Sequence, residues 1–448
     1  MKIPLIPPTL REVLGDLSVQ VFETFISNSH PLVGDRYVHW DKIRHRQPPT
    51  GLTPEQWWVA IKLARNSVLQ ALPLLDKSGS PFFAGTPEPV LAQLHQIDRD
   101  AAGQFLATQA FAGSEHQARY LVDALIQEAI TSSQLEGAAT TRKVAEAMLR
   151  AGRKPTNQSE RMIFNNYVAM QAMRDLKDKA ITPERILGLH RILTENTLAN
   201  PDDAGRLRTS DDVVVVDHRD GTVLHQPPPC SELSERLRRL CDFANASNTA
   251  ASFLHPVVRA IVLHFMIGYD HPFVDGNGRT ARALFYWSMA RAGYWLMVYV
   301  SISNLLKASP GQYVRAYLYT ETDSGDTTYF ILHQLNVIRR AIEQLQVYLV
   351  GVRNEQRATE KLLSASATLR ARLNHRQMAL ITHALKHPGA TYSIESQQRT
   401  HNISYQTART DLLALAAFGL LIKHTASRAF VFTAPVDLQA RIAALANP

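Results

Sequence analysis

The chain has 448 residues, enough for two to four domains with cores of their own, and its 45% hydrophobic and 20% charged residues are typical of globular proteins. No apolar run is long enough to cross a membrane, the first residues lack a signal-peptide core, and two cysteines are too few for a disulfide framework. The sequence therefore predicts a cytoplasmic protein with no membrane partner. The net charge of +8 is compatible with a nucleotide or nucleic-acid partner, but the excess is spread along the chain.

Residues 1–90 are rich in prolines and predict only short helices. The clearest helix is Pro54–Ala64, which begins with a proline and which Thr53 would cap. The aromatic residues of this segment favour a packing surface over a ligand site. We expect an N-terminal extension that packs on the following domain and carries no chemistry of its own.

Longer helices with few breakers are predicted after residue 90, over residues 116–130, 159–176, 182–197, 231–245 and 256–266. Directly after the first of them, Ser132, Glu136 and Gly137 fit the pattern Ser/Thr-x-x-x-Glu-Gly/Asn. Taken alone, this pattern is ordinary helix-end chemistry. Farther along, the β-branched run Val213–Val216 and the segment Thr222–His225 flank a turn, which predicts a β-hairpin.

The most informative stretch is the polar string His271-Pro-Phe-Val-Asp-Gly-Asn-Gly-Arg-Thr-Ala-Arg282, which separates apolar helices predicted over residues 257–265 and 281–292. Gly276 and Gly278 allow the main chain to approach a ligand closely. If Gly278 precedes the first turn of the second helix, free N–H groups at that helix end would face an anion. The string therefore predicts a cradle for phosphate groups.

The charged side chains of the same string suit nucleotide chemistry. Arg279 and Arg282 are three residues apart, share one helix face and could clamp successive phosphates. Asp275 offers a hard oxygen ligand to a Mg²⁺ ion that arrives with those phosphates. His271 carries an imidazole, which accepts a proton near neutral pH.

At every position the string resembles the active-site signature of the Fic family, His-x-Phe-x-Asp/Glu-Gly-Asn-Gly-Arg-x-x-Arg. The resemblance implies a mainly α protein with a helical Fic core. A β-hairpin flap, here residues 213–225, would hold the target segment beside the active site. The implied activity is that of a protein adenylyltransferase, a nucleotidyltransferase that moves AMP from ATP to a Tyr, Thr or Ser hydroxyl of a target protein, or of itself, and releases pyrophosphate.

The roles of individual residues also follow from the resemblance. His271 would be the general base, and Asp275 would hold Mg²⁺ between the α- and β-phosphates. Gly276, Asn277 and Gly278 would form an anion hole for the α- and β-phosphates. Arg279 would contact the β-phosphate, and Arg282 would hold the γ-phosphate. A glycine at position 278 sets the chain apart from the family's protein-phosphorylating branch, which carries a lysine there. One departure is Tyr269-Asp270, because an aliphatic residue commonly precedes the histidine.

Ser132, Glu136 and Gly137 resemble the family's inhibitory helix, here at about residues 131–137 and upstream of the core. The resemblance implies that Glu136 pairs with Arg282 and blocks the seat of the γ-phosphate, because a carboxylate and a phosphate compete for one guanidinium. Family members with such a glutamate can run the reverse reaction, so a de-adenylylating enzyme stays open. A UMP or phosphocholine transferase also stays open, because the sequence does not reveal the base pocket.

Residues 91–350 form the expected catalytic domain, and a connector helix is expected at residues 351–374. Residues 375–448 predict three helices and a small hairpin, which resemble a winged helix-turn-helix module. The recognition helix and wing would present Ser404, Tyr405, Gln406, Thr407, Arg409, Thr410 and Arg428. Such modules bind DNA or protein, so DNA is a candidate partner and a transcription regulator with a Fic sensor core is the alternative function. The sequence does not identify the target protein, and it does not decide whether the chain forms a homodimer.

Overall fold

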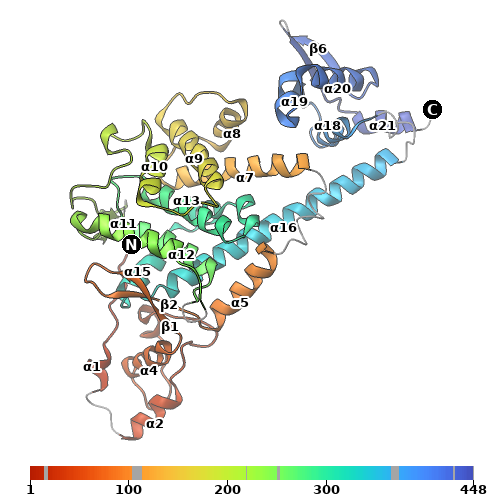
Figure 1. Cartoon of the computed structure of the whole chain (residues 1–448). Coiled ribbons are helices and arrows are strands. Elements are labelled where there is room, and N and C mark those ends of the chain that lie inside the picture. Colours follow the sequence, from red (N-terminus) through yellow and green to blue (C-terminus); the bar gives the residue numbers. More distant parts are fainter. Residues whose placement is uncertain are drawn as a thin grey trace. The chain divides into compact units, whose positions relative to one another are not determined.

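The structure of the chain is a computed structural model (Figure 1) and describes residues 1–14, 19–102, 114–217, 219–249, 253–364, 373–426 and 429–446. Two compact units are described separately below. One joins Met1–Leu106 to Tyr120–Glu343, and the other joins Ala107–Arg119 to Gln344–Pro448. The predicted mainly α fold is confirmed, because strands form only two-stranded pairs and one three-stranded sheet in the described part of the chain. Within that part, none of the helices combines the length and the hydropathy that crossing a membrane requires.

The first unit begins with the proline-rich segment. Its helices are α1 (Leu10–Leu14), α2 (Val19–Ser27), α3 (Trp40–Ile43), α4 (Pro54–Asn66) and α5 (Glu88–Ile97). Thr53 caps α4 as predicted, since its hydroxyl accepts the Gln56 N–H while the Gln56 side chain accepts the Thr53 N–H. The sequence prediction missed an antiparallel pair, β1 (Leu69–Leu75) and β2 (Pro81–Gly85). Pro73 lies within β1, at the point where the register of the pair shifts.

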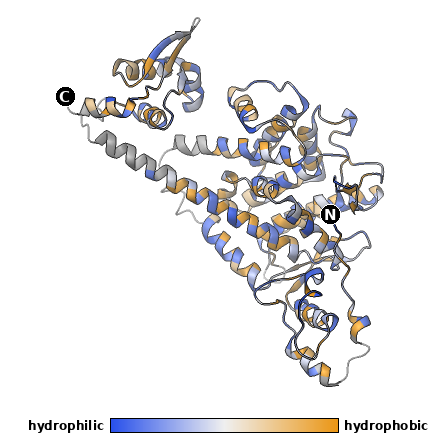
Figure 2. Ribbon diagram, turned by 180° about the vertical axis from the view of Figure 1, so that it is seen from behind, coloured by the Kyte–Doolittle hydropathy of each residue, from blue (hydrophilic) through white to orange (hydrophobic). Residues whose placement is uncertain are grey.

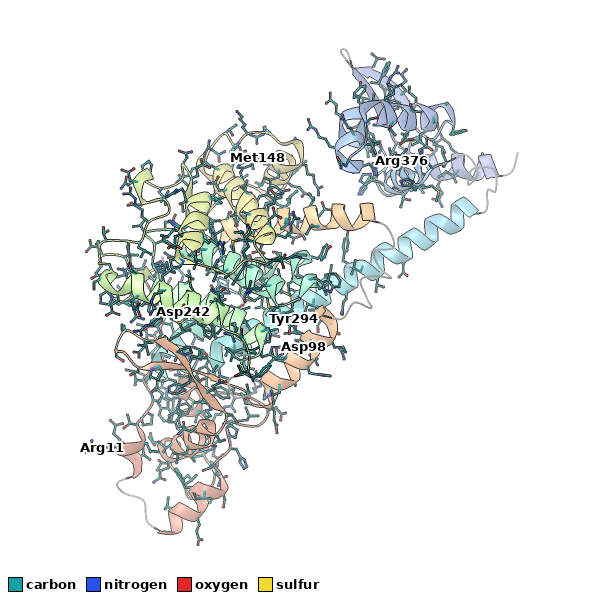
Figure 3. All side chains as sticks on the ribbon, in the orientation of Figure 1. Arg11, Asp98, Met148, Asp242, Tyr294 and Arg376 are labelled. Atoms are coloured by element: carbon teal, nitrogen blue, oxygen red, sulfur yellow. The ribbon has the colours of Figure 1, made fainter. Side chains whose placement is uncertain are left out.

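Buried polar contacts hold this segment on the helical core. Arg65 is fully buried and donates to the Tyr329 hydroxyl over 2.7 Å and to the Val38 carbonyl over 2.9 Å. Near the end of α5, Asp98 accepts a hydrogen bond of 2.6 Å from the Tyr294 hydroxyl (Figure 3). The N-terminal residues therefore share one compact unit with the core.

The core of the first unit is helical and surrounds two central helices, α12 (Pro256–Asp270) and α13 (Asn277–Arg291), which are buried along almost their whole length. The helices around them are α7 (Ser114–Leu135), α8 (Arg142–Ala151), α9 (Gln158–Asp175), α10 (Pro183–Thr194), α11 (Leu233–Asn245), α14 (Ile302–Ala308), α15 (Pro310–Thr322) and α16 (Thr328–Ser364). Figure 2 shows apolar and polar residues alternating along most helices, as expected of helices that turn one face to a core.

The structure corrects the predicted helix limits around the polar string. The helix α12 continues to Asp270, and α13 begins at Asn277 rather than Ala281. Gly278 therefore lies inside the first turn of α13 instead of preceding it. The predicted hairpin is present as a short antiparallel pair, β3 (Val215–Val216) and β4 (Val223–His225).

In the second unit, the three predicted helices are α18 (His375–Lys386), α19 (Ile394–His401) and α20 (Tyr405–Ala417). The predicted hairpin is β6 (Ile422–Ala426) and β7 (Ala429–Thr433), and β5 (Thr391–Ser393) adds a third strand in the order β5-β7-β6. Neither β5 nor the last helix, α21 (Leu438–Ala446), was predicted. Arg428 and much of the end of the expected connector lie outside the described residues. The winged-helix assignment stays a prediction.

Candidate active site

The loop between α12 and α13 is fixed by two residues with left-handed backbone angles. His271 has φ 45° and its N–H donates to the Ile267 carbonyl over 3.1 Å, which ends α12. Gly276 has φ 83° and stands directly before α13. A Cβ atom at Gly276 would lie 2.9 Å from Cγ2 of Thr194, so this position requires glycine for both conformation and space.

The Asn277 side chain is committed to the loop itself. Its Oδ1 accepts the Phe273 N–H over 3.0 Å, and its Nδ2 donates to the Phe273 carbonyl over 2.8 Å. The residue is 3% exposed. A ligand can therefore meet the backbone N–H of Asn277, at the start of α13, while the amide holds the loop in shape.

A histidine that the sequence analysis did not identify holds the other side of the loop. His190 on α10 accepts the Gly205 N–H at Nδ1 over 3.0 Å, so its proton lies on Nε2, which donates to the Asp275 carbonyl over 2.8 Å. The ring stacks on Phe273 with centroids 3.8 Å apart. Burial lowers the pKa of His190 to about 4, which keeps the ring neutral in this role.

Arg208 is a second residue that the sequence analysis missed. Its backbone N–H donates to the Pro272 carbonyl over 2.9 Å, and its Nε donates to the His271 carbonyl over 3.0 Å. The guanidinium is buried and also pairs with Asp211 over 2.8 Å. His271 therefore has its main chain fixed from outside the loop. Arg208 lies in the loop Pro201–Arg208, where nothing in the local pattern distinguished it from a surface residue.

The His271 ring is oriented for proton transfer. Its Nδ1 lies 3.2 Å from the Gly268 carbonyl, which can only accept, so Nδ1 carries the proton and Nε2 has a free lone pair. Burial lowers the pKa of His271, although the bond to Gly268 acts in the opposite direction. The imidazole is therefore neutral near pH 7, which is the state that a general base needs.

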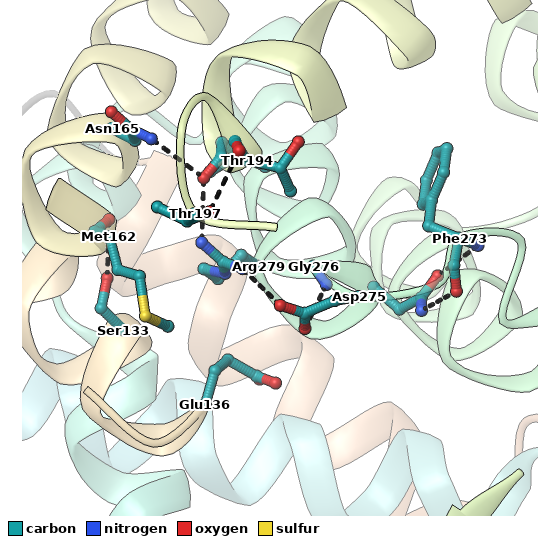
Figure 4. Close-up of polar contacts among 12 residues, drawn as sticks. Ser133, Glu136, Met162, Asn165, Thr194, Thr197, Phe273, Asp275, Gly276 and Arg279 are labelled. Carbon is teal, nitrogen blue, oxygen red and sulfur yellow. Dashed lines mark hydrogen bonds and ion pairs between the residues drawn. The ribbon is translucent and has the colours of Figure 1, made fainter. Parts of the chain in front are cut away.

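Asp275, at the end of the loop, pairs with Arg279 in the first turn of α13 (Figure 4). Asp275 is 54% exposed, its Oδ1 accepts the Gly276 N–H over 2.6 Å, and its Oδ2 lies 3.4 Å from Arg279. Arg279 is buried and donates to the Leu193 carbonyl over 2.9 Å, but its Nε has no partner among the described residues. Burial lowers the pKa of Arg279. An exposed carboxylate beside an incompletely paired arginine suits a metal-bound phosphate.

The structure brings Arg282 together with the predicted residues of α7. Arg282 donates from Nη2 to Glu136 Oε1 over 2.8 Å and from Nε to the Ser132 hydroxyl over 2.9 Å. Burial alone would lower the pKa of Arg282, but the charge and hydrogen bond of Glu136, together with the charges of Tyr313 and Glu128, raise it. Gly278 leaves the room that this contact needs, since a Cβ there would collide with Glu136 Oε1.

The surroundings of this ion pair differ from the expected ones. The sequence analysis placed residues 131–137 in a helix of their own, whereas Ser132 lies in the last turns of the long helix α7. Gly137, with φ 93°, turns the chain away directly after them. Arg282 is 1% exposed and Glu136 is 25% exposed, so the pair is largely shielded from solvent.

A cavity of about 200 Å³ lies beside the ion pair, and its wall includes Glu136, His271, Gly278 and Arg282. Its other lining comes from β3 and β4 of the hairpin and from α15, including Val215, Leu224, Tyr313 and Leu318. The cavity therefore has one polar wall that suits phosphates and an apolar wall that suits a flat ring.

The Asp270 carboxylate, whose environment the sequence left open, is buried and does not face solvent. Its Oδ1 lies 3.3 Å from Nη1 of Arg236 on α11. Burial raises the pKa of Asp270 to about 7, against the opposing charge of Arg236. The neighbouring Tyr269 uses its carbonyl to accept a bond of 2.7 Å from His225 of β4, which ties the hairpin to the end of α12.

Comparisons with known proteins agree with this geometry. Residues 180–289 match the model of the Fic/DOC family. The chain is 29% identical over 194 residues to a protein named protein adenylyltransferase Fic from Nematostella vectensis, which is 41% of this chain and 42% of that protein. It is 35% identical over 114 residues to protein adenylyltransferase fic-1 of Caenorhabditis elegans, which is 25% of this chain and 20% of that protein. The chain thus spans less than half the length of either relative.

A crystal structure of a Fic family protein from Desulfovibrio desulfuricans G20 has a similar fold. The TM-score is 0.51 at 17% sequence identity, and the match covers 78% of this chain and 97% of that one. At this identity the likeness supports the fold alone. The residues that match the family model include the string between α12 and α13.

Proposed function

This chain carries a Fic domain, and from the geometry of its active site we propose that it is a protein adenylyltransferase. The reaction transfers AMP from ATP to a Tyr, Thr or Ser hydroxyl of a target protein, or of the chain itself. The observation that carries the proposal is the arrangement of His271 and Arg282 on one cavity with a glycine cradle between them. The names of the relatives support the same activity. The catalytic domain is proposed to span residues 91–350.

In the proposed step, the target hydroxyl oxygen attacks the α-phosphorus of ATP. A new oxygen–phosphorus bond forms, the bond from the α-phosphorus to the bridging oxygen breaks, and pyrophosphate leaves. His271 Nε2 takes the proton of the hydroxyl. The neutral ring, the Gly268 contact at Nδ1 and the Arg208 bond to the His271 carbonyl all support this role, because they fix both the tautomer and the position of the base.

The start of α13 is the proposed cradle for the phosphates. The backbone N–H groups of Asn277, Gly278 and Arg279 belong to the first turn of the helix and have no intrahelical partners. The unpartnered Nε of buried Arg279 supports a contact with the β-phosphate. Arg282 would hold the γ-phosphate once Glu136 leaves it.

Asp275 is the proposed ligand of Mg²⁺. Among the residues that the structure describes, no group of three or more His, Cys, Asp or Glu side chains could hold a metal ion by itself. One exposed carboxylate nevertheless fits Mg²⁺, which keeps several waters and is commonly held by one carboxylate together with substrate phosphates. When bound, the ion would neutralise charge on the phosphates that Asp275 faces.

Glu136 is the proposed inhibitor of the enzyme. It occupies the Arg282 guanidinium that a γ-phosphate would need, and Ser132 completes the contact from the same helix. ATP could still enter with its triphosphate displaced, but the α-phosphorus would then not face the target hydroxyl. Two alternative activities would use the same site. Reverse removal of AMP would use Glu136 to place a water, and a transferase of UMP or phosphocholine would use the same loop.

A second candidate function is DNA binding by the C-terminal unit. Ser404, Tyr405, Gln406 and Thr410, at the start of α20, have exposed side chains, so this helix presents a polar face. If the helix binds duplex DNA, Arg409→Ala in the full chain should weaken binding, and higher salt should weaken it further. Arg441→Ala, in α21, is the matched control. DNA binding that neither Arg409→Ala nor higher salt weakens would argue against a DNA contact by α20 and favour a protein-docking role. Placement in the cytoplasm stays a prediction.

The experiment that tests the proposed function uses labelled ATP. Wild-type protein and Glu136→Gly are incubated with ATP labelled on the α-phosphate or on the γ-phosphate, in lysate and alone, and modified peptides are identified by mass spectrometry. The proposal predicts label from the α-phosphate on hydroxyl side chains, and more of it with the variant. Label from the γ-phosphate, or none from either position, would exclude adenylyl transfer.

A further inference from the structure

The helix α7 carries a buried carboxylate, Glu128, which lies eight residues before Glu136. Its side chain is 2% exposed. Residues 128, 132 and 136 are spaced by four, so they lie along one side of the helix. The side of α7 that meets Arg282 through Ser132 and Glu136 therefore also presents Glu128, two turns away from the ion pair.

Glu128 is held by three donors from the start of α14. Its Oε2 accepts the Ser301 hydroxyl over 2.7 Å and the Ser303 N–H over 3.3 Å, while Oε1 accepts the Ser303 hydroxyl over 2.5 Å. Thr131, also on α7, has its hydroxyl 3.0 Å from that of Ser301. Bonds to a carboxylate are stronger than neutral ones, so this contact fixes α7 along its own axis.

The segment that receives Glu128 is in turn tied to α13. Tyr286 lies one turn after Arg282, donates its hydroxyl to the Val300 carbonyl over 3.0 Å and accepts the Ile302 N–H over 3.0 Å. The helix α7 thus meets α13 at two points. One is the direct contact of Glu136 with Arg282, and the other runs from Glu128 through residues 300–303 to Tyr286.

From these contacts we propose that Glu128 is a positioning residue of the inhibitory contact, which it serves by fixing α7 so that Glu136 reaches Arg282. The proposal rests on the inhibition described above. Neither Glu128 nor its two serine partners lines the nucleotide cavity, whereas Glu136 and Arg282 do. ATP therefore competes for the contact of Glu136 with Arg282 and leaves the contact of Glu128 with residues 301–303 in place. The strength of inhibition depends on how firmly the Glu128 contact holds the helix.

The test uses the full chain and two readouts, the rate of AMP incorporation and the Kd of a non-hydrolysable ATP analogue. Glu128→Gln keeps the shape of the side chain and removes its charge. It should raise incorporation and tighten analogue binding several-fold. Ser303→Ala, which removes one donor and leaves the carboxylate in place, should act in the same direction and covers the case that Glu128→Gln does not fold. Gln127→Ala, at the adjacent and partly exposed position, is the matched control and should change neither readout.

The decisive comparison combines Glu128→Gln with Glu136→Gly. If Glu128 acts through Glu136, the double variant should match Glu136→Gly in both readouts. An equal gain from Glu128→Gln in the Glu136→Gly background would overturn the proposal, because the effect would then not pass through the inhibitory contact. Wild-type behaviour of both Glu128→Gln and Ser303→Ala beside an activated Glu136→Gly would overturn it as well and leave the inhibition intact. Absence of AMP incorporation in every variant would instead refute the adenylyl-transfer function, while analogue affinity still reports on Glu128.

Discussion

His271 of the loop 271–276 and Glu136, directly after the end of α7, line the same cavity, but the two regions are held in opposite ways. The loop is held by Asn277, His190 and Arg208 through contacts that need no ligand. The end of α7 is held on Arg282 by a carboxylate and a serine, which are groups that a phosphate can replace. The difference predicts that substitutions in the loop lose activity, whereas substitutions at the end of α7 gain it.

The largest expected effect lies in the loop. Replacing His271 by alanine removes the base and should lower the rate of AMP transfer by ~10²–10⁴-fold, which is typical for loss of general-base catalysis. Binding of an ATP analogue should stay close to wild type, because the cradle and both arginines remain. The surface variant His45→Ala is the matched control in the same labelling assay. Near wild-type labelling by His271→Ala would mean that another group accepts the proton.

The next effect tests the support beneath that base. Arg208→Lys keeps the charge but cannot reproduce the bonds of a planar guanidinium to the His271 and Asp211 oxygens. A misplaced base should lower kcat by roughly 10–100-fold, with little change in KM for ATP. Steady-state kinetics at saturating ATP separates the two constants. A change confined to KM would mean that Arg208 contributes to nucleotide binding, and it would contradict the view that Arg208 serves only to hold the loop.

The smallest expected effect is that of pH. Burial lowers the pKa of His271, so the unprotonated form dominates above its ordinary value of about 6.5. The rate should fall as pH drops through the lowered pKa, below 6.5, and should change by less than about twofold between pH 7 and 8.5. A kcat/KM profile of the Glu136→Gly variant measures this directly. An acid limb centred well above pH 7 would contradict the assignment of His271 as the buried base.

The same contrast explains what the sequence could reveal. The residues of the string are close in the chain and their types suit phosphate chemistry, and the resemblance of the whole string to the Fic signature gave each residue its expected role. The partner of Arg282 is 146 positions away, and the sequence predicted it only through the resemblance of Ser132, Glu136 and Gly137 to the family's inhibitory helix. His190 and Arg208 were missed, since they act over 85 and 63 positions through backbone carbonyls and share no local pattern.

Misses in the fold have similar causes. The pair β1–β2 was not predicted because the prolines of residues 1–90 disfavour strands, and Pro73 fits into β1 only where the register of the pair shifts. The strand β5 is three residues long and is specified by its partner β7 rather than by its own sequence. The Asp270 carboxylate was uncertain because its burial depends on Arg236 of another helix.

We propose that Glu136 restrains the enzyme by occupying Arg282. A charge-assisted hydrogen bond contributes about 1.5–3 kcal/mol, so Glu136→Gly should raise AMP incorporation by roughly 10–100-fold. The measurement is the rate of incorporation for the wild type, Glu136→Gly, Arg282→Ala and the double variant, with a confirmed target present. We expect a gain for Glu136→Gly that Arg282→Ala cancels in the double variant. A Glu136→Gly variant that labels no faster than wild type, or a double variant that keeps the full gain, would contradict it.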